Sequence, residues 1–127
     1  MTDLKKAKDR AWKVFSLYIR TKYADFDGYV TCVTCGATKP IKEMQAGHFI
    51  PGRRGLTFFD ERNVHPQDSG CNLFKHGNLI PYYEFMVKTY GQGVIEELKE
   101  LDKVSKSWTV AEYNAIHDHY KNLLSML

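Results

Sequence analysis

The stretch that decides the fold runs from Cys32 to Asn78 and reads CVTCGATKPIKEMQAGHFIPGRRGLTFFDERNVHPQDSGCNLFKHGN. It contains two cysteines in a C-x-x-C turn, a histidine that follows a hydrophobic run, and a Cys71-Asn72 pair near its end. These are the residue types that a metal-organised ββα site requires. The segments on either side have the pattern of helices, and we expect them to support this stretch.

Short strands and a short helix are predicted within this part of the chain. Residues 29–31 form a strand that leads into the C-x-x-C turn, and residues 44–49 form a second strand. Residues 50–61 have glycines, a proline and no regular period, which predicts a loop. Residues 63–67 form a third strand, and a helix begins near Ser69 and stops at Gly77, where glycine suits a left-handed position.

The flanking segments have helical periodicity. Residues 4–22 place apolar side chains at i, i+3, i+4 and i+7 with basic residues between them, which predicts an amphipathic helix. Helices resume after Asn78, are interrupted at Gly91, and end with a helix that Thr109 and Glu112 open as a capping box. The predicted fold class is α+β in one domain, 1–127. A basic N-terminal helix (1–24) and a C-terminal helical region (79–127) flank a zinc knuckle and ββα-metal core (28–78).

Length and composition exclude several classes of protein. A chain of 127 residues with 43% apolar residues has room for one domain and a modest core. No run approaches the roughly 18 apolar residues of a membrane span, and the N-terminus lacks the apolar region of a secretory signal. We therefore expect a cytoplasmic protein with no membrane partner. In that reducing compartment, a C-x-x-C pair and an odd total of 3 cysteines favour metal binding over disulfides.

The charge distribution favours a polyanionic partner at the N-terminal end. Residues 1–22 hold seven Lys and Arg against two Asp, a net +5, whereas residues 83–127 carry a net charge of −2. Such lysines can also be no more than the solvated face of a helix. If the partner is DNA, the expected phosphate contacts are Lys5, Lys6, Lys13, Arg53, Arg54, Arg62 and Lys75.

His48 is the candidate general base. In a ββα-metal nuclease, a histidine at the end of the first strand activates a water, and a divalent ion held from the following helix stabilises the charge on the phosphate. A lone histidine after an apolar run is often a core residue. The cysteines upstream and the Cys71-Asn72 pair downstream favour the catalytic interpretation.

Three more residues complete the expected site. Asn72 is the candidate ligand of the divalent ion, Mg²⁺ or Mn²⁺. Lys75 lies three residues further on the same helix face and could reach phosphate. Asn63 can hold the long loop through hydrogen bonds from its side chain to the backbone, and so position the strand that carries His48.

These residues carry a family resemblance. Residues 32–91 resemble the HNH or His-Me finger nucleases, and nearly the whole chain resembles the phage NinG (Rap) recombination endonucleases, which act on branched DNA. The matching pieces are residues 12–16 (WKVFS), 19–20 (IR), 28–36 (GYVTCVTCG), 46–49 (AGHF), 59–65 (FDERNVH), Gln67, 71–72 (CN), 77–78 (GN) and 90–91 (YG). The resemblance implies a phage- or prophage-encoded nuclease that works in the host cytoplasm on branched DNA such as Holliday junctions. It implies His48 as the base, Asn72 as the ligand of the ion and Asn63 as the organiser of the loop.

The chain departs from the family pattern at two positions. Many relatives have an acidic metal ligand just before the catalytic histidine, where this chain has Gly47. Either Asn72 is nearly the sole protein ligand of the ion, or another residue contributes, for which His65 is the candidate. Asp68 stands where the pattern would place a third zinc cysteine, which implies a site of Cys32, Cys35, Asp68 and Cys71. Asp68 could instead be only the N-cap of the following helix.

Two further expectations stay open. A zinc-containing DNA-binding protein of phage recombination, without catalysis, would keep the cysteines and the basic helix but would not need His48 and Asn72 together. We also expect a homodimer, because symmetric cutting of a branched substrate takes two active sites. The apolar stripes of the terminal helices could supply the interface.

Overall fold

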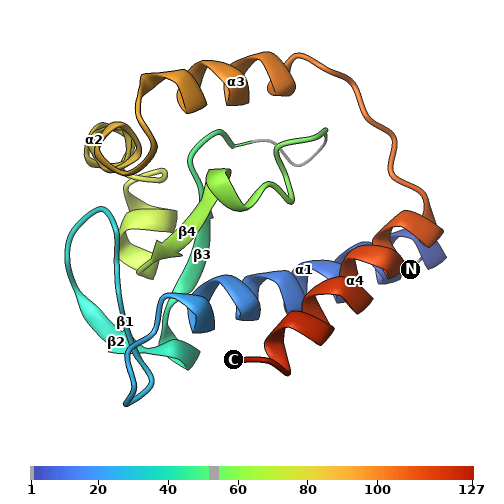
Figure 1. The fold of residues 1–127 in the computed structure, drawn as a ribbon, viewed down its shortest axis with the longest axis horizontal. Coiled ribbons are helices and arrows are strands. Elements are labelled where there is room, and N and C mark those ends of the chain that lie inside the picture. The colour runs from blue at the N-terminus through green and yellow to red at the C-terminus, as the bar shows by residue number, and fades with distance from the viewer. Residues whose placement is uncertain (1, 52–54) are drawn as a thin grey trace.

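A computed structural model describes residues 2–51 and 55–127. The chain has a mixed α+β architecture with two small antiparallel sheets, so the expected α+β class is confirmed. Its elements follow in the order α1 (Asp3–Lys22), β1 (Tyr29–Thr31), β2 (Thr38–Pro40), β3 (Gln45–His48), β4 (Val64–Gln67), a short π-helix (Gly70–Phe74), α2 (Leu79–Tyr90), α3 (Gln92–Asp102) and α4 (Val110–Leu124). Figure 1 shows α1 and α4 side by side along one edge, α3 along the opposite edge, and the β3–β4 hairpin between them.

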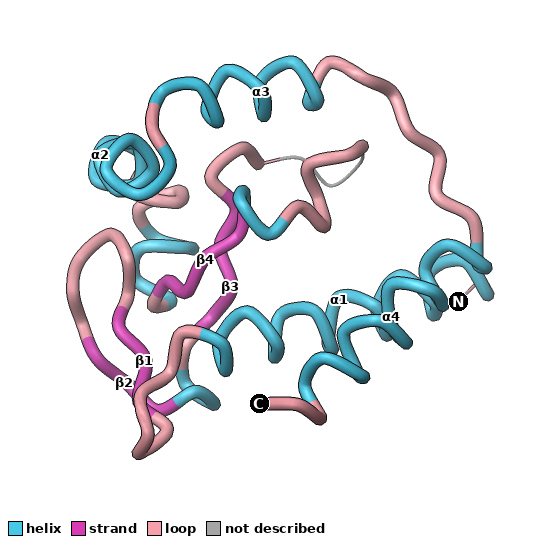
Figure 2. The backbone as a smooth tube through the Cα atoms, in the orientation of Figure 1, coloured by secondary structure: helices cyan, strands magenta, loops and turns pink. Residues whose placement is uncertain are grey.

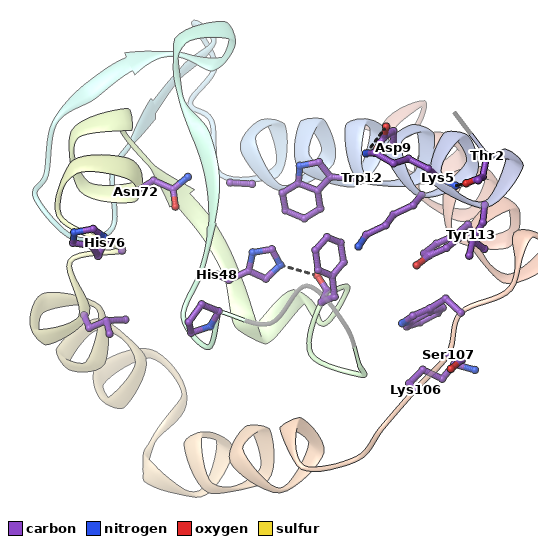
Figure 3. Close-up of a pocket in the computed structure, with 18 residues that line it drawn as sticks. Thr2, Lys5, Asp9, Trp12, His48, Asn72, His76, Lys106, Ser107 and Tyr113 are labelled. Carbon is purple, nitrogen blue, oxygen red and sulfur yellow. Dashed lines mark hydrogen bonds and ion pairs between the residues drawn. The ribbon is translucent and has the colours of Figure 1, made fainter.

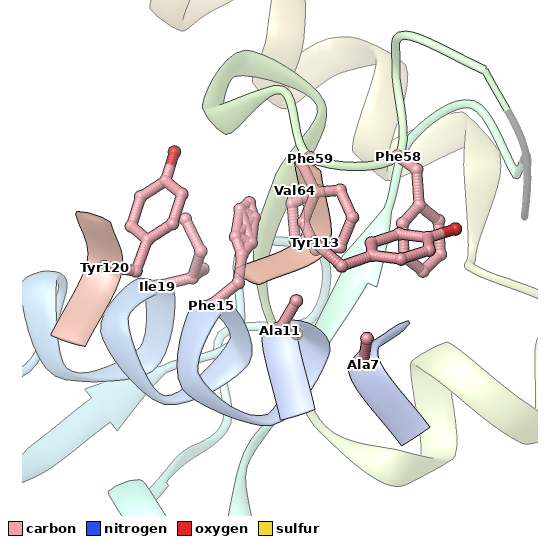
Figure 4. Packing of buried hydrophobic residues seen from close by; sticks show 10 residues of the cluster. Ala7, Ala11, Phe15, Ile19, Phe58, Phe59, Val64, Tyr113 and Tyr120 are labelled. Carbon is pink, nitrogen blue, oxygen red and sulfur yellow. The ribbon is translucent and has the colours of Figure 1, made fainter. Parts of the chain in front are cut away.

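Helix α1 forms because its apolar residues recur once per turn. The residues Ala7, Ala11, Phe15 and Ile19, four positions apart, are all buried. The Thr2 side chain accepts a hydrogen bond from the backbone N–H of Lys5 and caps the helix start. Ala7 and Ala11 are small enough for α4 to lie close, and Phe15 stacks edge-on against Tyr120 of α4 at 4.7 Å between ring centroids. The resulting core is drawn in Figure 4.

The hairpin β3–β4 is the centre of the predicted core region. Its register places Gly47 opposite His65 and Gln45 opposite Gln67. The π-helix that follows carries Cys71 and Asn72. The strand–strand–helix order is therefore present, as the tube in Figure 2 shows. That this unit is a ββα-metal core stays a prediction.

One local expectation differs in detail from the structure, and the predicted break at Gly91 is confirmed. The predicted helix from Ser69 to Gly77 contains only a five-residue π-helix, with Lys75 N–H bonded to the Gly70 carbonyl. Left-handed residues from His76 to Asn78 then end it. Gly77 is left-handed as expected, with φ +88°, but the C-cap is Lys75, so the C′ position itself belongs to His76. The break between α2 and α3 occurs at Gly91, whose φ of +87° disfavours other residues.

The C-terminal helices cover the remaining core. Thr109 and Glu112 form the predicted capping box at the start of α4. A second apolar cluster lies under α2 and α3 and contains Phe49, Tyr82, Met86, Ile95 and Leu98. None of the helices in the described ranges combines the length and apolarity that a membrane crossing requires.

Candidate functional site

Four potential metal ligands converge where the β1–β2 turn meets the π-helix. The sulfur atoms of Cys32, Cys35 and Cys71 and a carboxylate oxygen of Asp68 all lie within 4.8 Å of one another. Cys32 and Cys71 are buried, whereas Cys35 is exposed. Three thiols and one carboxylate form a donor set that zinc accepts. The cluster could therefore hold a metal ion such as zinc.

Asp68 satisfies both interpretations of its position. Its Oδ1 accepts a hydrogen bond of 2.9 Å from the backbone N–H of Cys71, as a helix-capping residue does. Its Oδ2 accepts one of 2.8 Å from the Cys35 thiol. Because a carboxylate has two oxygens, the cap and the contact with the cysteine cluster do not compete.

The pKa values of Cys35 and Asp68 shift in opposite directions. Cys35 is exposed as a residue, but the partial burial of its thiol, followed by the hydrogen bond to Asp68, raises the pKa of that thiol to about 12. The same hydrogen bond, followed by that from the Cys71 backbone, lowers the pKa of Asp68. Without metal, Cys35 thus keeps its thiol proton and donates it in the hydrogen bond to the ionised Asp68, and metal binding would release that proton.

An open groove of about 1130 Å³ lies beside the N-terminal half of α1. His48 and Asn72 both line it, and the segment before α4 forms its far wall with Lys106 and Trp108 (Figure 3). His48 contacts two of the aromatic walls. Its ring centroid lies 5.1 Å from that of Trp12 and 4.9 Å from that of Phe58.

The backbone of the long loop fixes the imidazole of His48. Its Nε2 lies 3.0 Å from the Phe58 carbonyl oxygen. A carbonyl can only accept, so Nε2 carries a proton and the lone pair of the neutral ring is on Nδ1. Burial lowers the pKa of His48, although the contact with Phe58 opposes this shift. The neutral form is therefore present at neutral pH.

The Asn72 amide is also oriented by a neighbour. Its Nδ2 donates a 2.8 Å hydrogen bond to Oε1 of Gln45 in β3. The amide oxygen Oδ1 is thereby turned away from Gln45 and can accept from another partner. Asn72, which lines the groove together with His48, thus has an amide oxygen available to a further partner.

Asn63 bonds to the loop as the sequence suggested. Its Oδ1 accepts from the Ile50 N–H at 2.8 Å, and its Nδ2 donates to the carbonyls of Ile50 and Thr57, both at 3.1 Å. The side chain is fully buried. It therefore ties both ends of the loop that carries Phe58 to the start of β4.

Two tyrosines bind the ring nitrogens of His65. Tyr82 donates to the Gly47 carbonyl at 2.7 Å, so its oxygen accepts from His65 Nδ1–H at 2.9 Å. His65 Nε2 then accepts from the Tyr90 hydroxyl at 2.7 Å. Burial lowers the pKa of His65 to about 3, which keeps it neutral. Because both ring nitrogens are engaged, the expected contact of His65 with a catalytic ion has no support in this geometry. His65 instead braces the backbone of residue 47.

The expected DNA-contacting residues differ in availability. Lys6, Lys13 and Lys75 are exposed, and Lys5 lines the groove while paired with Asp9 at 3.1 Å. Arg62 is engaged within the protein, with Asp60 at 2.9 Å and Glu97 at 2.7 Å, and these acids raise its pKa. Arg53 and Arg54 lie outside the described residues.

Sequence reasoning missed several residues that build the groove. Trp12 contacts His48, Lys8 lies over the Phe58 ring at 5.0 Å from its centroid, and Lys106 reaches the groove from the segment before α4. Their contacts join segments far apart in the chain. Only Trp12 left a signal, because it belongs to a stretch that matches the family pattern.

Comparison with known proteins gives one family. The NinG family model, described as "Bacteriophage Lambda NinG protein", matches residues 1–127. The chain is 32% identical over 119 residues to protein ninG of Salmonella phage P22, which covers 93% of this chain and 56% of that protein. Protein ninG of Escherichia phage 933W is 33% identical over the same shares of the two chains. Protein ninG of Escherichia phage lambda is 32% identical over 119 residues, which covers 93% of this chain and 55% of that protein.

The chain thus spans about half the length of the curated relatives it matches. No solved structure matches it. Membership of the wider HNH superfamily stays a prediction. The family match along residues 1–127, with identities above 30% over most of the chain, shows that this protein belongs to the NinG family of bacteriophage proteins.

Proposed function

We propose that this protein is a metal-dependent DNA endonuclease of the HNH type that acts on branched DNA. The observation that carries the proposal is the shared groove of His48 and Asn72, in which each side chain is oriented by a separate neighbour. Purely structural roles for His48 and Asn72 would not require both side chains to line one open groove. A general base and a metal ligand require that arrangement.

His48 has the properties of a general base in this setting. The hydrogen bond to Phe58 places its lone pair on Nδ1, and the lowered pKa keeps it unprotonated near neutral pH. Asn63 holds the loop that supplies the Phe58 carbonyl, so the orientation of the imidazole depends on Asn63 at one remove. In this proposal His48 takes a proton from the attacking water.

The residues present also suit a hard divalent ion. The Asn72 oxygen is of the ligand type that Mg²⁺ and Mn²⁺ prefer. When bound, such an ion would stabilise the charge that develops on the scissile phosphate and the leaving oxygen. We assign zinc, with a structural role, to the separate Cys32, Cys35, Asp68 and Cys71 cluster, whose thiols suit a softer ion.

A DNA phosphate backbone is the substrate that fits the charge of the groove. Lys5, Lys8 and Lys106 line it, although Lys5 is paired with Asp9 and Lys106 with Glu112, and the exposed Lys6 and Lys13 add to the basic charge of α1. Phosphate contacts of this kind supply most of the affinity of nucleic-acid binding proteins and weaken with salt. The branched nature of the substrate is proposed from the family resemblance.

We propose that two copies act together. The apolar stripes of α1 and α4 pack on each other within the chain, so we look for the pairing surface elsewhere. Among the exposed large apolar side chains, five lie close together in sequence on and just before α2, at Leu73, Phe74, Leu79, Ile80 and Tyr83. A twofold pairing through this surface would supply two active sites for opposed strands.

The test is cleavage of a labelled four-way junction, fork, flap and plain duplex in the presence of Mg²⁺ or Mn²⁺. We expect wild-type protein to cut the branched substrates and to leave 5′-phosphate and 3′-hydroxyl ends. Asn72→Ala should abolish cleavage and leave DNA binding within a few-fold, because the lysines dominate affinity. The control His119→Ala replaces an exposed histidine on α4 and should cut like wild type.

A non-catalytic DNA-binding protein is the second candidate, favoured by the cysteine cluster, which needs no catalysis to be useful. It predicts salt-dependent DNA binding without cleavage of any of the four substrates. An Asn72→Ala protein that cuts at the wild-type rate would instead leave an active nuclease but remove Asn72 from its site.

A further inference from the structure

The side chain of Gln67, at the end of β4, is held in one orientation. It is fully buried, and its Nε2 donates to the Gly77 carbonyl at 2.8 Å and to the Thr34 hydroxyl at 3.2 Å. The Gly77 carbonyl can only accept, so the amide cannot be turned around. Its oxygen, Oε1, is therefore fixed on the side away from Gly77.

That oxygen has no partner. Within residues 2–51 and 55–127, Gln67 Oε1 is the one buried side-chain nitrogen or oxygen that no hydrogen bond satisfies. Leaving a buried acceptor without a donor costs free energy, and folded proteins rarely do so unless a water or an ion completes the site. The orphaned oxygen thus indicates a ligand.

Gly47 shows where this oxygen lies. A Cβ placed on Gly47 would stand 1.8 Å from Gln67 Oε1 and 3.0 Å from Asn72 Oδ1. The two amide oxygens therefore meet beside residue 47, and only glycine leaves room for them. The nitrogens of both amides are engaged elsewhere, with Gly77 and Thr34 in one case and Gln45 in the other. Two fixed acceptors converge here, which is the environment that a cation stabilises.

We propose that Gln67 supplies a second protein oxygen to the divalent ion at Asn72. The proposal rests on the proposed function, since the ion is the one assigned there. It replaces His65 in that role and accounts for Gly47, because the amide of Gln67 fills the space of a side chain at that position. Gln67 is then a catalytic residue that acts from the strand opposite His48.

A neutral ligand pair has a consequence for metal affinity. Two amide oxygens bring no negative charge, so the ion should depend on DNA phosphate oxygens for most of its affinity. Mn²⁺ should therefore bind weakly to the protein alone and more tightly to the protein–DNA complex. An ordered water that donates to both oxygens is the competing explanation.

The test measures Mn²⁺ binding by the electron paramagnetic resonance signal of the free ion, with the protein bound to a four-way junction. All proteins carry His48→Ala, so that the DNA stays intact and the readout is independent of activity. Gln67→Met keeps the size of the side chain but removes the oxygen, and we expect Mn²⁺ to bind about tenfold more weakly or worse. Gln67→Glu keeps an oxygen and adds charge, and binding should be at least as tight as in the parent.

The pair of variants separates the metal role from a structural one. If Gln67 matters only as a donor to Gly77 and Thr34, or holds a bridging water, Glu should be no better than Met. Equal Mn²⁺ affinity for Gln67→Met and the parent would also overturn the proposal. Thermal melts establish that each variant folds. If Gln67→Met does not fold, the test rests on Gln67→Glu alone, and weaker Mn²⁺ binding by this variant than by the parent refutes the proposal.

Asn72→Ala in the same background distinguishes this failure from failure of the proposed function. If Asn72→Ala abolishes Mn²⁺ binding but Gln67→Met does not, Gln67 is not a ligand, and the assignment of the ion to Asn72 stands. A parent complex that binds no Mn²⁺ at the junction would remove the ion site altogether.

Discussion

Gly47→Ala should be among the most damaging single-atom changes in this protein. The added Cβ would lie 1.8 Å from Oε1 and 2.8 Å from Cδ of Gln67, a side chain that is fully buried and held by two hydrogen bonds. Overpacking of this kind costs about 1–3 kcal/mol, and displacing Gln67 would lose two hydrogen bonds worth about 1 kcal/mol each. We expect a loss of roughly 3–5 kcal/mol in the free energy of unfolding, measured by urea titration. At about 4 °C per kcal/mol, the Tm should fall by roughly 12–20 °C.

Gly93→Ala is the matched control. A Cβ at Gly93, the second residue of α3, meets no heavy atom within 4 Å. Alanine is the better helix former by up to about 1 kcal/mol, so this change should be neutral or stabilising. In a Gln67→Ala background the clash partner is gone, and Gly47→Ala should then cost clearly less than in wild type. Equal costs of Gly47→Ala in both backgrounds would refute the proposed contact between these residues.

Three more predictions follow from the site and the surface. Asp68→Asn keeps the oxygen that caps the Cys71 N–H, so it should preserve the stability of the metal-free protein while weakening zinc binding. Asp68→Cys should tighten zinc binding. Unchanged zinc content in both variants would leave Asp68 only the capping role. Cleavage requires unprotonated His48, and burial lowers the pKa of this histidine below the ordinary histidine value of 6.5. The single-turnover rate should therefore fall only at pH values below 6.5. A loss of rate that begins above pH 6.5 would contradict the assignment of the base. Sedimentation at micromolar concentration should show a dimer that Ile80→Lys, on the exposed face of α2, converts to a monomer, and a monomeric wild-type protein with and without branched DNA would exclude the paired arrangement.

Local patterns made much of the fold predictable. The amphipathic period of α1, the Thr109–Glu112 capping box and the left-handed glycine at 77 are each encoded within a few residues. The hairpin strands were also predictable within a residue or two, since polar and turn-forming stretches bound them. By contrast, β2 contains only Thr38–Pro40, and a three-residue strand that ends in proline has no periodic signal.

The site was predictable in its residue types but not in its contacts. His48 and Asn72 stand out in the sequence, but the Phe58 carbonyl and Gln45 that orient them come from other elements. The two tyrosines that hydrogen-bond to the ring nitrogens of His65 come from α2. The alternation of side chains along β4 alone could not show that these nitrogens are engaged. Asp68 looked like a choice between cap and ligand because a sequence gives no indication that each carboxylate oxygen has a separate partner.

The most direct test of the account is the single-turnover cleavage of a labelled four-way junction by wild-type and His48→Ala protein in Mg²⁺, at saturating protein. Both proteins should bind the junction alike, since His48 makes no expected phosphate contact, and His48→Ala should cut at least about a hundredfold more slowly because the general base is lost. A His48→Ala protein that cuts as fast as wild type would contradict the assignment of the base, and with it the proposed mechanism.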